Sequence, residues 1–75
     1  MGCKIKLNKR GTGDKIFRAI EKSGLSYEKV AEELGLQSPR VIYEWTNGNN
    51  LPSLVRLVNL AYLLGVHLED LLETE

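Results

Sequence analysis

Hydrogen-bonding side chains gather between residues 37 and 49, and their types suit contacts with a phosphate backbone and with the edges of bases. The strongest donor is Arg40, whose guanidinium can donate two parallel hydrogen bonds to O6 and N7 of a guanine. Uncharged polar side chains of the kinds that bind phosphate oxygens surround it. Together with one tyrosine that precedes this stretch, the candidate contact residues are Tyr27, Gln37, Ser38, Arg40, Tyr43, Asn47 and Asn49.

Each candidate also has an interpretation that involves no base. Arg40 can instead bind a phosphate or lie in solvent on the surface. Tyr43 can bond a phosphate or pack on a thymine methyl group, or it can lie half-buried against the preceding helix. Glu44 repels phosphate unless it accepts from cytosine N4, and is otherwise solvated. Asn47 and Asn49 serve equally well as turn residues.

Two short amphipathic helices, joined by a tight turn, must position these side chains. The first has Ser26 as its predicted N-cap, and its apolar face carries Val30, Ala31 and Leu34. Gly35 supplies the left-handed residue that ends this helix. The second begins at Ser38 and Pro39, a capping serine with proline at the first helical position, and runs to Gly48. Such a helix-turn-helix unit places its second helix in a DNA major groove.

Ser38 and Gln37 precede this second helix, so both can contribute beyond the turn itself. Ser38 is first a cap, and its hydroxyl or backbone N–H can also meet a phosphate at the helix start. Gln37 can reach a phosphate or a base edge.

The rest of the chain predicts three more helices after a short arm. The arm, residues 1–11, carries the cations Lys4, Lys6, Lys9 and Arg10, which suit phosphates or a minor groove. A first helix is expected from Gly13 to Ser23, beginning near Thr12 or Asp14. A fourth is expected over residues 53–64, with an apolar face of Leu54, Leu57, Val58, Ala61 and Leu64. A short fifth, residues 67–73, offers Leu68, Leu71 and Leu72.

Composition agrees with one small all-α domain in a reducing cytoplasm. The 75 residues contain no apolar run long enough to span a bilayer, and the N-terminus lacks the apolar segment of a secretory signal. The lone Cys3 offers neither an internal disulfide nor a zinc site. Residues 1–40 carry nine Lys/Arg against five Asp/Glu, or +4, and residues 41–75 carry one against five, or −4. This asymmetry permits a basic face toward phosphate without demanding one.

The sequence offers no catalytic constellation. One histidine and one cysteine cannot supply a Ser/His/Asp or Cys/His arrangement. The segment from Gly11 to Lys15 lacks the full spacing of a phosphate-binding loop and a preceding strand. His67 has no metal-ligating partners at a suitable spacing. We therefore expect a non-enzyme with no cofactor and no metal site.

Residues 13–72 resemble the lambda-repressor-like helix-turn-helix domain of the Xre/Cro family. The motifs that carry the resemblance are LSYEKVAEELGL, SPRVIYEWTNG and LPSLVRLVNLAYLLGVHLEDLL. The resemblance implies a five-helix fold, sequence-specific binding to duplex DNA, usually as a dimer, and control of transcription. It divides the chain into a basic N-terminal arm, residues 1–11, and a DNA-binding domain, residues 12–75.

The chain departs from the family pattern at two places. Tyr27 stands where the family often has a glutamine that anchors a phosphate, and its hydroxyl can do the same less directly. The turn is also one residue longer than usual. Aligning on Ser38 buries Ile42 and Trp45, whereas aligning on Gly35 buries Val41 instead. We prefer the first register because it keeps the cap and makes Trp45 a core residue rather than a stacking platform for bases.

These observations favour a transcriptional regulator that represses as a dimer at a palindromic operator. Leu68, Leu71 or Leu72 are expected to be exposed for the two-fold partner. The alternative is a protein-interaction module, antitoxin-like or a regulatory partner, that uses the same fold to hold another protein. The near-neutral charge and the leucine-rich acidic C-terminus favour this alternative, and the basic arm with Arg40 favours DNA.

Overall fold

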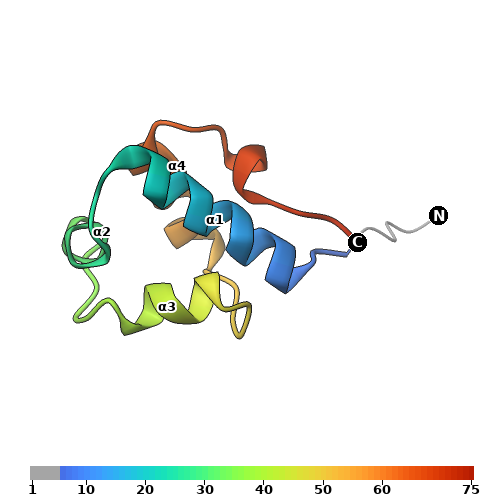
Figure 1. The fold of residues 1–75 in the computed structure, drawn as a ribbon, viewed down its shortest axis with the longest axis horizontal. Helices are drawn as coiled ribbons and strands as arrows, with labels where there is room; N and C mark the ends of the chain where they lie inside the picture. The colour runs from blue at the N-terminus through green and yellow to red at the C-terminus, as the bar shows by residue number, and fades with distance from the viewer. Residues whose placement is uncertain (1–5) are drawn as a thin grey trace.

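The computed structural model describes residues 6–75, which form four α-helices and one turn of 3-10 helix. α1 crosses the middle of the molecule, with α3 on one side and η1 on the other (Figure 1). Within the described residues the all-α prediction is confirmed, since their one strand-like feature is an isolated antiparallel bridge between Leu7 and Thr74. The elements are α1 (Lys9–Ser23), α2 (Tyr27–Glu33), α3 (Arg40–Thr46), α4 (Leu54–Leu64) and η1 (Leu68–Leu71).

The predicted fifth α-helix is wrong, because η1 is only four residues long. His67 does occupy its N-cap position, where the His67 backbone N–H donates to the Asp70 carboxylate at 3.2 Å. Leu72 then takes an extended conformation, with φ −106° and ψ 140°. The chain leaves the helical path at this point because residues 73–75 hydrogen-bond to residues 6–8 instead.

The hydrophobic core draws on every helix. Its ten buried apolar side chains are Ile16, Ile20, Val30, Ala31, Ile42, Trp45, Leu57, Leu60, Ala61 and Leu71. Burial of Ile42 and Trp45 confirms the register that was aligned on Ser38, since Val41 stays 38% exposed. The core thus fixes which face of α3 points outward.

The first helix begins four residues earlier than predicted, at Lys9. Its N-cap is Asn8, whose side-chain oxygen accepts from the Gly11 N–H at 2.9 Å. The prediction was wrong because it took Thr12 or Asp14 as the start signal and overlooked the Asn8 cap. The two glycines of this stretch lie inside α1, where a Cβ on Gly13 would collide with the backbone carbonyl of Trp45. Gly13 is therefore a point of close approach between α1 and α3.

The buried face of α4 is partly different from the predicted one. Ser53 caps α4, as its hydroxyl accepts from the Arg56 N–H at 3.3 Å, and Gly65 ends it with φ 70°. The core side consists of Leu57, Leu60 and Ala61. The predicted Leu54 and Val58 are instead 69% and 47% exposed. The sequence pattern failed here because α4 is apolar on both faces, so helical spacing fits either one.

No helix in residues 6–75 combines the length and the apolar character needed to cross a bilayer. α4, the most apolar in sequence, has 11 residues, and a span needs about 20.

Candidate nucleic-acid interface

The turn between α2 and α3 forms as the sequence predicts. Ser26 caps α2, and its hydroxyl accepts from the Lys29 N–H at 3.0 Å. Gly35 has φ 74°, and the next N–H, that of Leu36, donates back to the Ala31 carbonyl at 2.8 Å. No atom lies within 4 Å of a Cβ placed on Gly35, so glycine is required here for its backbone conformation rather than for space.

α3 begins one residue later than predicted. Arg40 is its first residue and Pro39 holds the N-cap position. Pro39 has ψ −2°, short of a helical value, although its carbonyl already accepts from the Ile42 N–H at 3.0 Å. Ser38 still supports the start, because its hydroxyl accepts from the Arg40 N–H at 3.3 Å. Ser38 therefore still bonds to the first N–H of α3, although it lies one residue before the N-cap position.

Arg40, Tyr43 and Asn47 lie on the exposed side of α3. The Arg40 guanidinium takes part in no salt bridge within residues 6–75. Asn47 is the C-cap residue, and its backbone N–H donates to the Tyr43 carbonyl at 2.9 Å. Asn47 itself is exposed. Charged and polar donors therefore run along the outer face of α3 from its first residue to its cap.

The two tyrosines of the candidate set lie against each other. The rings of Tyr27, on α2, and Tyr43, on α3, have centroids 4.6 Å apart and are tilted by 37°. Tyr43 keeps half of its surface exposed. The half-buried interpretation of Tyr43 is thus confirmed, and the pair brings one phenol from each helix to the same surface.

Glu44 is directed at the loop after α3. Its carboxylate accepts from the Asn50 side-chain amide at 3.0 Å, and its carbonyl accepts from the N–H groups of Asn49 and Asn50 at 3.0 and 3.3 Å. Glu44 thus has a partner within the protein that the sequence did not indicate. Asn50 was not among the predicted residues, and its proximity to Glu44 depends on the loop conformation. The Asn49 side chain stays exposed.

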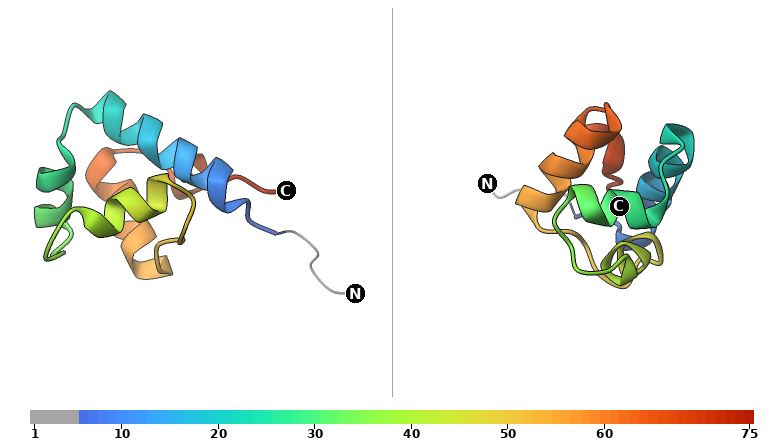
Figure 2. Two further views of the ribbon diagram at one scale, coloured as in Figure 1. Left: turned by 60° about the horizontal axis from the view of Figure 1, so that its bottom comes forward. Right: turned by 90° about the vertical axis from the view of Figure 1, so that its left-hand side faces the viewer.

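The loop also brings the start of α1 to the end of α3. Gly48 has φ 80°, and a Cβ on it would lie 2.9 Å from Arg10 Cα. Both figures of the fold place the first turn of α1 beside this loop (Figures 1 and 2). Lys9 and Arg10 are exposed there. Cations of the predicted arm therefore lie near the loop that follows α3, while Lys4 lies outside the described residues.

The candidate residues thus lie before the start of α3, along its exposed side and beyond its end. Gln37 and Ser38 are exposed just before α3, Tyr27 and Tyr43 meet beside it, and Asn49 lies beyond its end. Arg40 lies at the start of α3, where Glu28 and Glu32 line a hollow together with Gln37 and Ser38. The cations of α1 lie near the end of α3. The chemistry available is hydrogen-bond donation to anionic or acceptor-rich partners.

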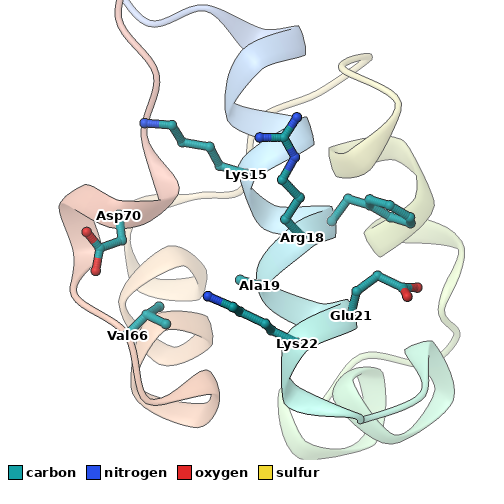
Figure 3. A pocket seen from close by; sticks show the side chains of 8 residues that line it. Lys15, Arg18, Ala19, Glu21, Lys22, Val66 and Asp70 are labelled. Atoms are coloured by element: carbon teal, nitrogen blue, oxygen red, sulfur yellow. The ribbon is translucent and has the colours of Figure 1, made fainter.

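A groove lies apart from this candidate interface. This groove, of about 760 Å³, runs between α1 and the segment that carries Val66 and Asp70. Lys15 and Lys22 extend from α1 toward that segment (Figure 3). It contains none of the candidate residues.

Residues 6–75 also contain no group of three or more His, Cys, Asp or Glu that would suit a metal ion.

Comparison with solved structures places this fold among DNA-binding regulators. The restriction-modification controller protein C.AhdI from Aeromonas hydrophila is 25% identical, with a TM-score of 0.77 over 85% of this chain and 91% of that one. The DNA-binding domain of BldD is also 25% identical, with a TM-score of 0.75 over 88% of this chain and 94% of its own.

The same fold occurs inside a larger protein of another kind. HppE with bound cobalt is 24% identical, with a TM-score of 0.77 over 91% of this chain but only 38% of its own, and has also been solved with substrate. That likeness shows the fold alone. No curated protein matches the sequence.

A family model described as helix-turn-helix matches residues 16–71, which is most of the chain. That match runs from α1 through α4 to the end of η1 and so includes the whole α2–α3 unit. The family and these first two neighbours are DNA-binding regulators, not enzymes. The chain therefore belongs to the helix-turn-helix family of DNA-binding regulators, of the Xre and lambda-repressor-like type.

Proposed function

We propose that this chain is a sequence-specific transcriptional regulator of the cytoplasm that binds duplex DNA through α3 and represses as a dimer at a palindromic operator. The observation that carries the proposal is the division of α3 into two faces. Ile42 and Trp45 lie in the core, at 0% and 3% exposure, and Arg40 lies on the surface outside every salt bridge of residues 6–75. A helix anchored in this way can enter a major groove without losing its packing.

Arg40 is the residue that reads sequence in this proposal. It is the one basic residue between positions 37 and 50, and it begins α3. The N-terminal residues of a recognition helix are the ones that contact base edges. A bidentate arginine–guanine pair contributes about 1–3 kcal/mol of discrimination against other bases.

The other candidates orient the protein on the sugar–phosphate backbone. Gln37 and Ser38 precede the N-terminus of α3, and the phenols of Tyr27 and Tyr43 lie on the same surface. Contacts of this type fix register and carry no sequence information themselves. Lys9 and Arg10 add cations at the far end of α3, where each neutralised phosphate increases affinity at low salt.

The dimer surface must differ from the predicted one. Leu71 is fully buried, and Leu68 and Leu72 are partly buried against the same core, so these leucines close the monomer. Four exposed apolar side chains instead lie along α4, and three of them are the most exposed large apolar residues described. We call the four the α4 outer face: Leu54, Val55, Val58 and Tyr62, with 69%, 69%, 47% and 89% exposure.

A second copy of the chain is the occupant we propose for the α4 outer face. An apolar, uncharged helix surface is self-complementary, which is what a two-fold interface requires. α4 also follows directly after the loop that ends α3, so pairing through α4 fixes the separation of two recognition helices. The half-sites are then about 10–10.5 bp apart, one turn of DNA.

The same α4 outer face supports the alternative function, a module that holds a different protein. An exposed apolar surface of this kind fits either a second copy or another chain. The two proposals differ in DNA binding and in self-association, so both are measured together.

Selection of bound sequences from a random duplex library, with sedimentation of the free and bound protein, tests this proposal. We expect an enriched sequence with two-fold symmetry, two protein chains per duplex, and weaker binding at higher salt. Enrichment of no sequence, with retention of a monomer at high concentration, would reject the regulator and leave the protein-interaction module. Enrichment of a single half-site by a monomer would reject only the dimer.

A further inference from the structure

Residues 72–75 fold back along the start of α1 and bond to it at several points. The Asn8 N–H donates to the Glu73 carbonyl at 2.7 Å, and the Glu75 N–H donates to the Lys6 carbonyl at 2.9 Å. Between these two bonds lies the antiparallel bridge of Leu7 with Thr74. The segment runs from η1 back to the first turn of α1 (Figure 1). The approach to α1 is thus held in place by chain more than sixty residues away in sequence.

Thr12 is the centre of this contact. It is the one polar residue among the buried residues described, with no exposed surface. Its hydroxyl oxygen accepts from the Glu73 N–H at 3.0 Å, and the hydroxyl lies 3.5 Å from the Glu73 carbonyl. A buried hydroxyl with this arrangement fixes residue 73 against α1.

Two further residues of α1 are fitted to the same segment. Lys15 donates from Nζ to the Leu72 carbonyl at 2.9 Å and lies 3.2 Å from the Glu73 carboxylate. Its side chain extends from α1 across to that segment (Figure 3). Gly11 leaves room for the Glu73 side chain, because a Cβ on Gly11 would lie 2.5 Å from Glu73 Cγ. The contact therefore combines hydrogen bonds with a close approach of the Glu73 side chain to the backbone of α1.

The opposite side of this first turn touches the end of the recognition helix. Gly13 meets the Trp45 and Thr46 carbonyls, and Gly48 meets Arg10 Cα. The first turn of α1, which carries Lys9 and Arg10, is thus held between residues 72–75 and the end of α3.

We infer that residues 72–75 position Lys9 and Arg10 beside α3 so that they contact DNA phosphates, and that Thr12 is the positioning residue for this contact. The inference rests on the proposed DNA binding and extends it to a region outside the α2–α3 unit. Cations held in a fixed place lose less conformational entropy on binding than cations on a free arm. The segment therefore raises phosphate affinity without touching DNA.

The test compares Thr12→Val, which keeps the shape and removes the hydroxyl, with Thr12→Ser, which keeps the hydroxyl. Affinity for one fixed duplex is measured over a range of salt concentrations. Each neutralised phosphate contributes about 0.9 to the slope of log affinity against log salt. We expect Thr12→Val to make that slope shallower by about one to two, and to weaken binding about tenfold at low salt. Thr12→Ser should behave as the wild type.

Two further variants separate positioning from folding. Gly11→Ala, whose Cβ would displace Glu73, should reproduce the loss seen with Thr12→Val while leaving Thr12 intact. In a chain that already carries Lys9→Ala and Arg10→Ala, Thr12→Val should have no further effect, since the two act through the same contacts. A destabilised chain instead loses active protein and keeps the slope, so a slope change reports position.

Three results would overturn the inference. The first is that Thr12→Val and Gly11→Ala bind the duplex with the affinity of the wild type. The second is that they weaken binding by the same factor at every salt concentration. The third is that Thr12→Val weakens binding equally in the chain that lacks Lys9 and Arg10. Failure of the wild type to bind any duplex would instead remove the proposed function, and this inference with it. A wild type that binds while the variants do not differ would remove only the inference.

Discussion

α3 and α4 use the same core in the same way and present opposite chemistry to solvent. α3 buries Ile42 and Trp45, and α4 buries Leu57, Leu60 and Ala61 in the same cluster. Outward, α3 exposes Arg40 and Asn47 with the half-exposed Tyr43, whereas α4 exposes the four apolar side chains of its outer face, with Asn59 as its one exposed polar residue. Packing explains the inner faces of both helices and says nothing about the outer ones. Function is therefore to be sought in the outer faces, for which we propose contact with nucleic acid through α3 and with protein through α4.

The largest effects should come from the inner faces, equally for both helices. Ile42→Ala and Leu60→Ala each remove a side chain with no exposed surface, so each should lower the free energy of unfolding by about 2–5 kcal/mol. The matched surface change, Tyr62→Ala on the outer face of α4, should stay within about 0.5 kcal/mol. Chemical denaturation followed by Trp45 fluorescence measures all three. A large loss for Tyr62→Ala would mean that the outer face of α4 packs within the monomer.

The next largest effect concerns the α4 outer face. Val55→Glu places a charge in the proposed two-fold interface and should weaken self-association by at least about tenfold. Phe17→Glu is the matched control, since Phe17 is an exposed apolar residue of α1, 44% exposed. Equilibrium sedimentation gives both dissociation constants. Equal self-association in the two variants would place the interface elsewhere on the chain.

The ring contact between α2 and α3 should have a smaller effect on stability. Tyr43→Ala removes a stacked pair with Tyr27 and should cost about 0.5–1.5 kcal/mol beyond the area it exposes. Tyr43→Phe keeps the ring, so its stability should match the wild type, and any loss of DNA affinity then measures the hydroxyl alone. A stability loss in Tyr43→Phe would show that the phenol is bonded within the protein.

The smallest effect should come from the exposed ion pairs of α2. Hydrogen bonds from Lys29 to Glu32 and then Glu33, at 3.3 and 3.4 Å, raise the pKa of Lys29 above its usual value of 10.5. Any stability that this raised pKa provides is complete below the unfolded pKa and is lost only as pH rises through the folded one. Lys29→Gln should therefore have the same stability as the wild type at neutral pH, because exposed pairs contribute little. Thermal unfolding at pH 7 and above pH 10 checks both statements.

The sequence predicts the helix-turn-helix unit best because its signals are local. Ser26 and Gly35 mark the ends of α2 within the segment itself, and the spacing of Ile42 and Trp45 identifies the inner face of α3. By contrast, the form of η1 depends on contacts of residues 73–75 with the start of the chain, such as that between Thr12 and Glu73, which are 61 positions apart. The Asn8 cap that begins α1 is a local signal, and the prediction overlooked it. Gly11 and Gly13 lie inside α1 because each is a point of close approach to a residue distant in sequence, Glu73 for Gly11 and Trp45 for Gly13. No local pattern contains that information.

The candidate site divides in the same way. Arg40, Tyr43 and Asn47 were predicted to point outward from helical spacing, and they do. The bond from Asn50 to Glu44 was missed because it depends on how the loop folds back. The outer face of α4 was misassigned because an apolar helix gives no contrast between its two sides.

Binding of Arg40→Ala to two duplexes tests the central claim, that the outer face of α3 reads DNA sequence. One duplex carries the sequence selected by the wild type, and the other carries the same bases in scrambled order. Loss of one bidentate contact should weaken binding to the selected duplex by about 5–150-fold, and binding to the scrambled one far less. The preference at one base pair per half-site should relax, with helical content unchanged because Arg40 is exposed. An equal loss on both duplexes would make Arg40 a phosphate contact, and no loss on either would contradict the account.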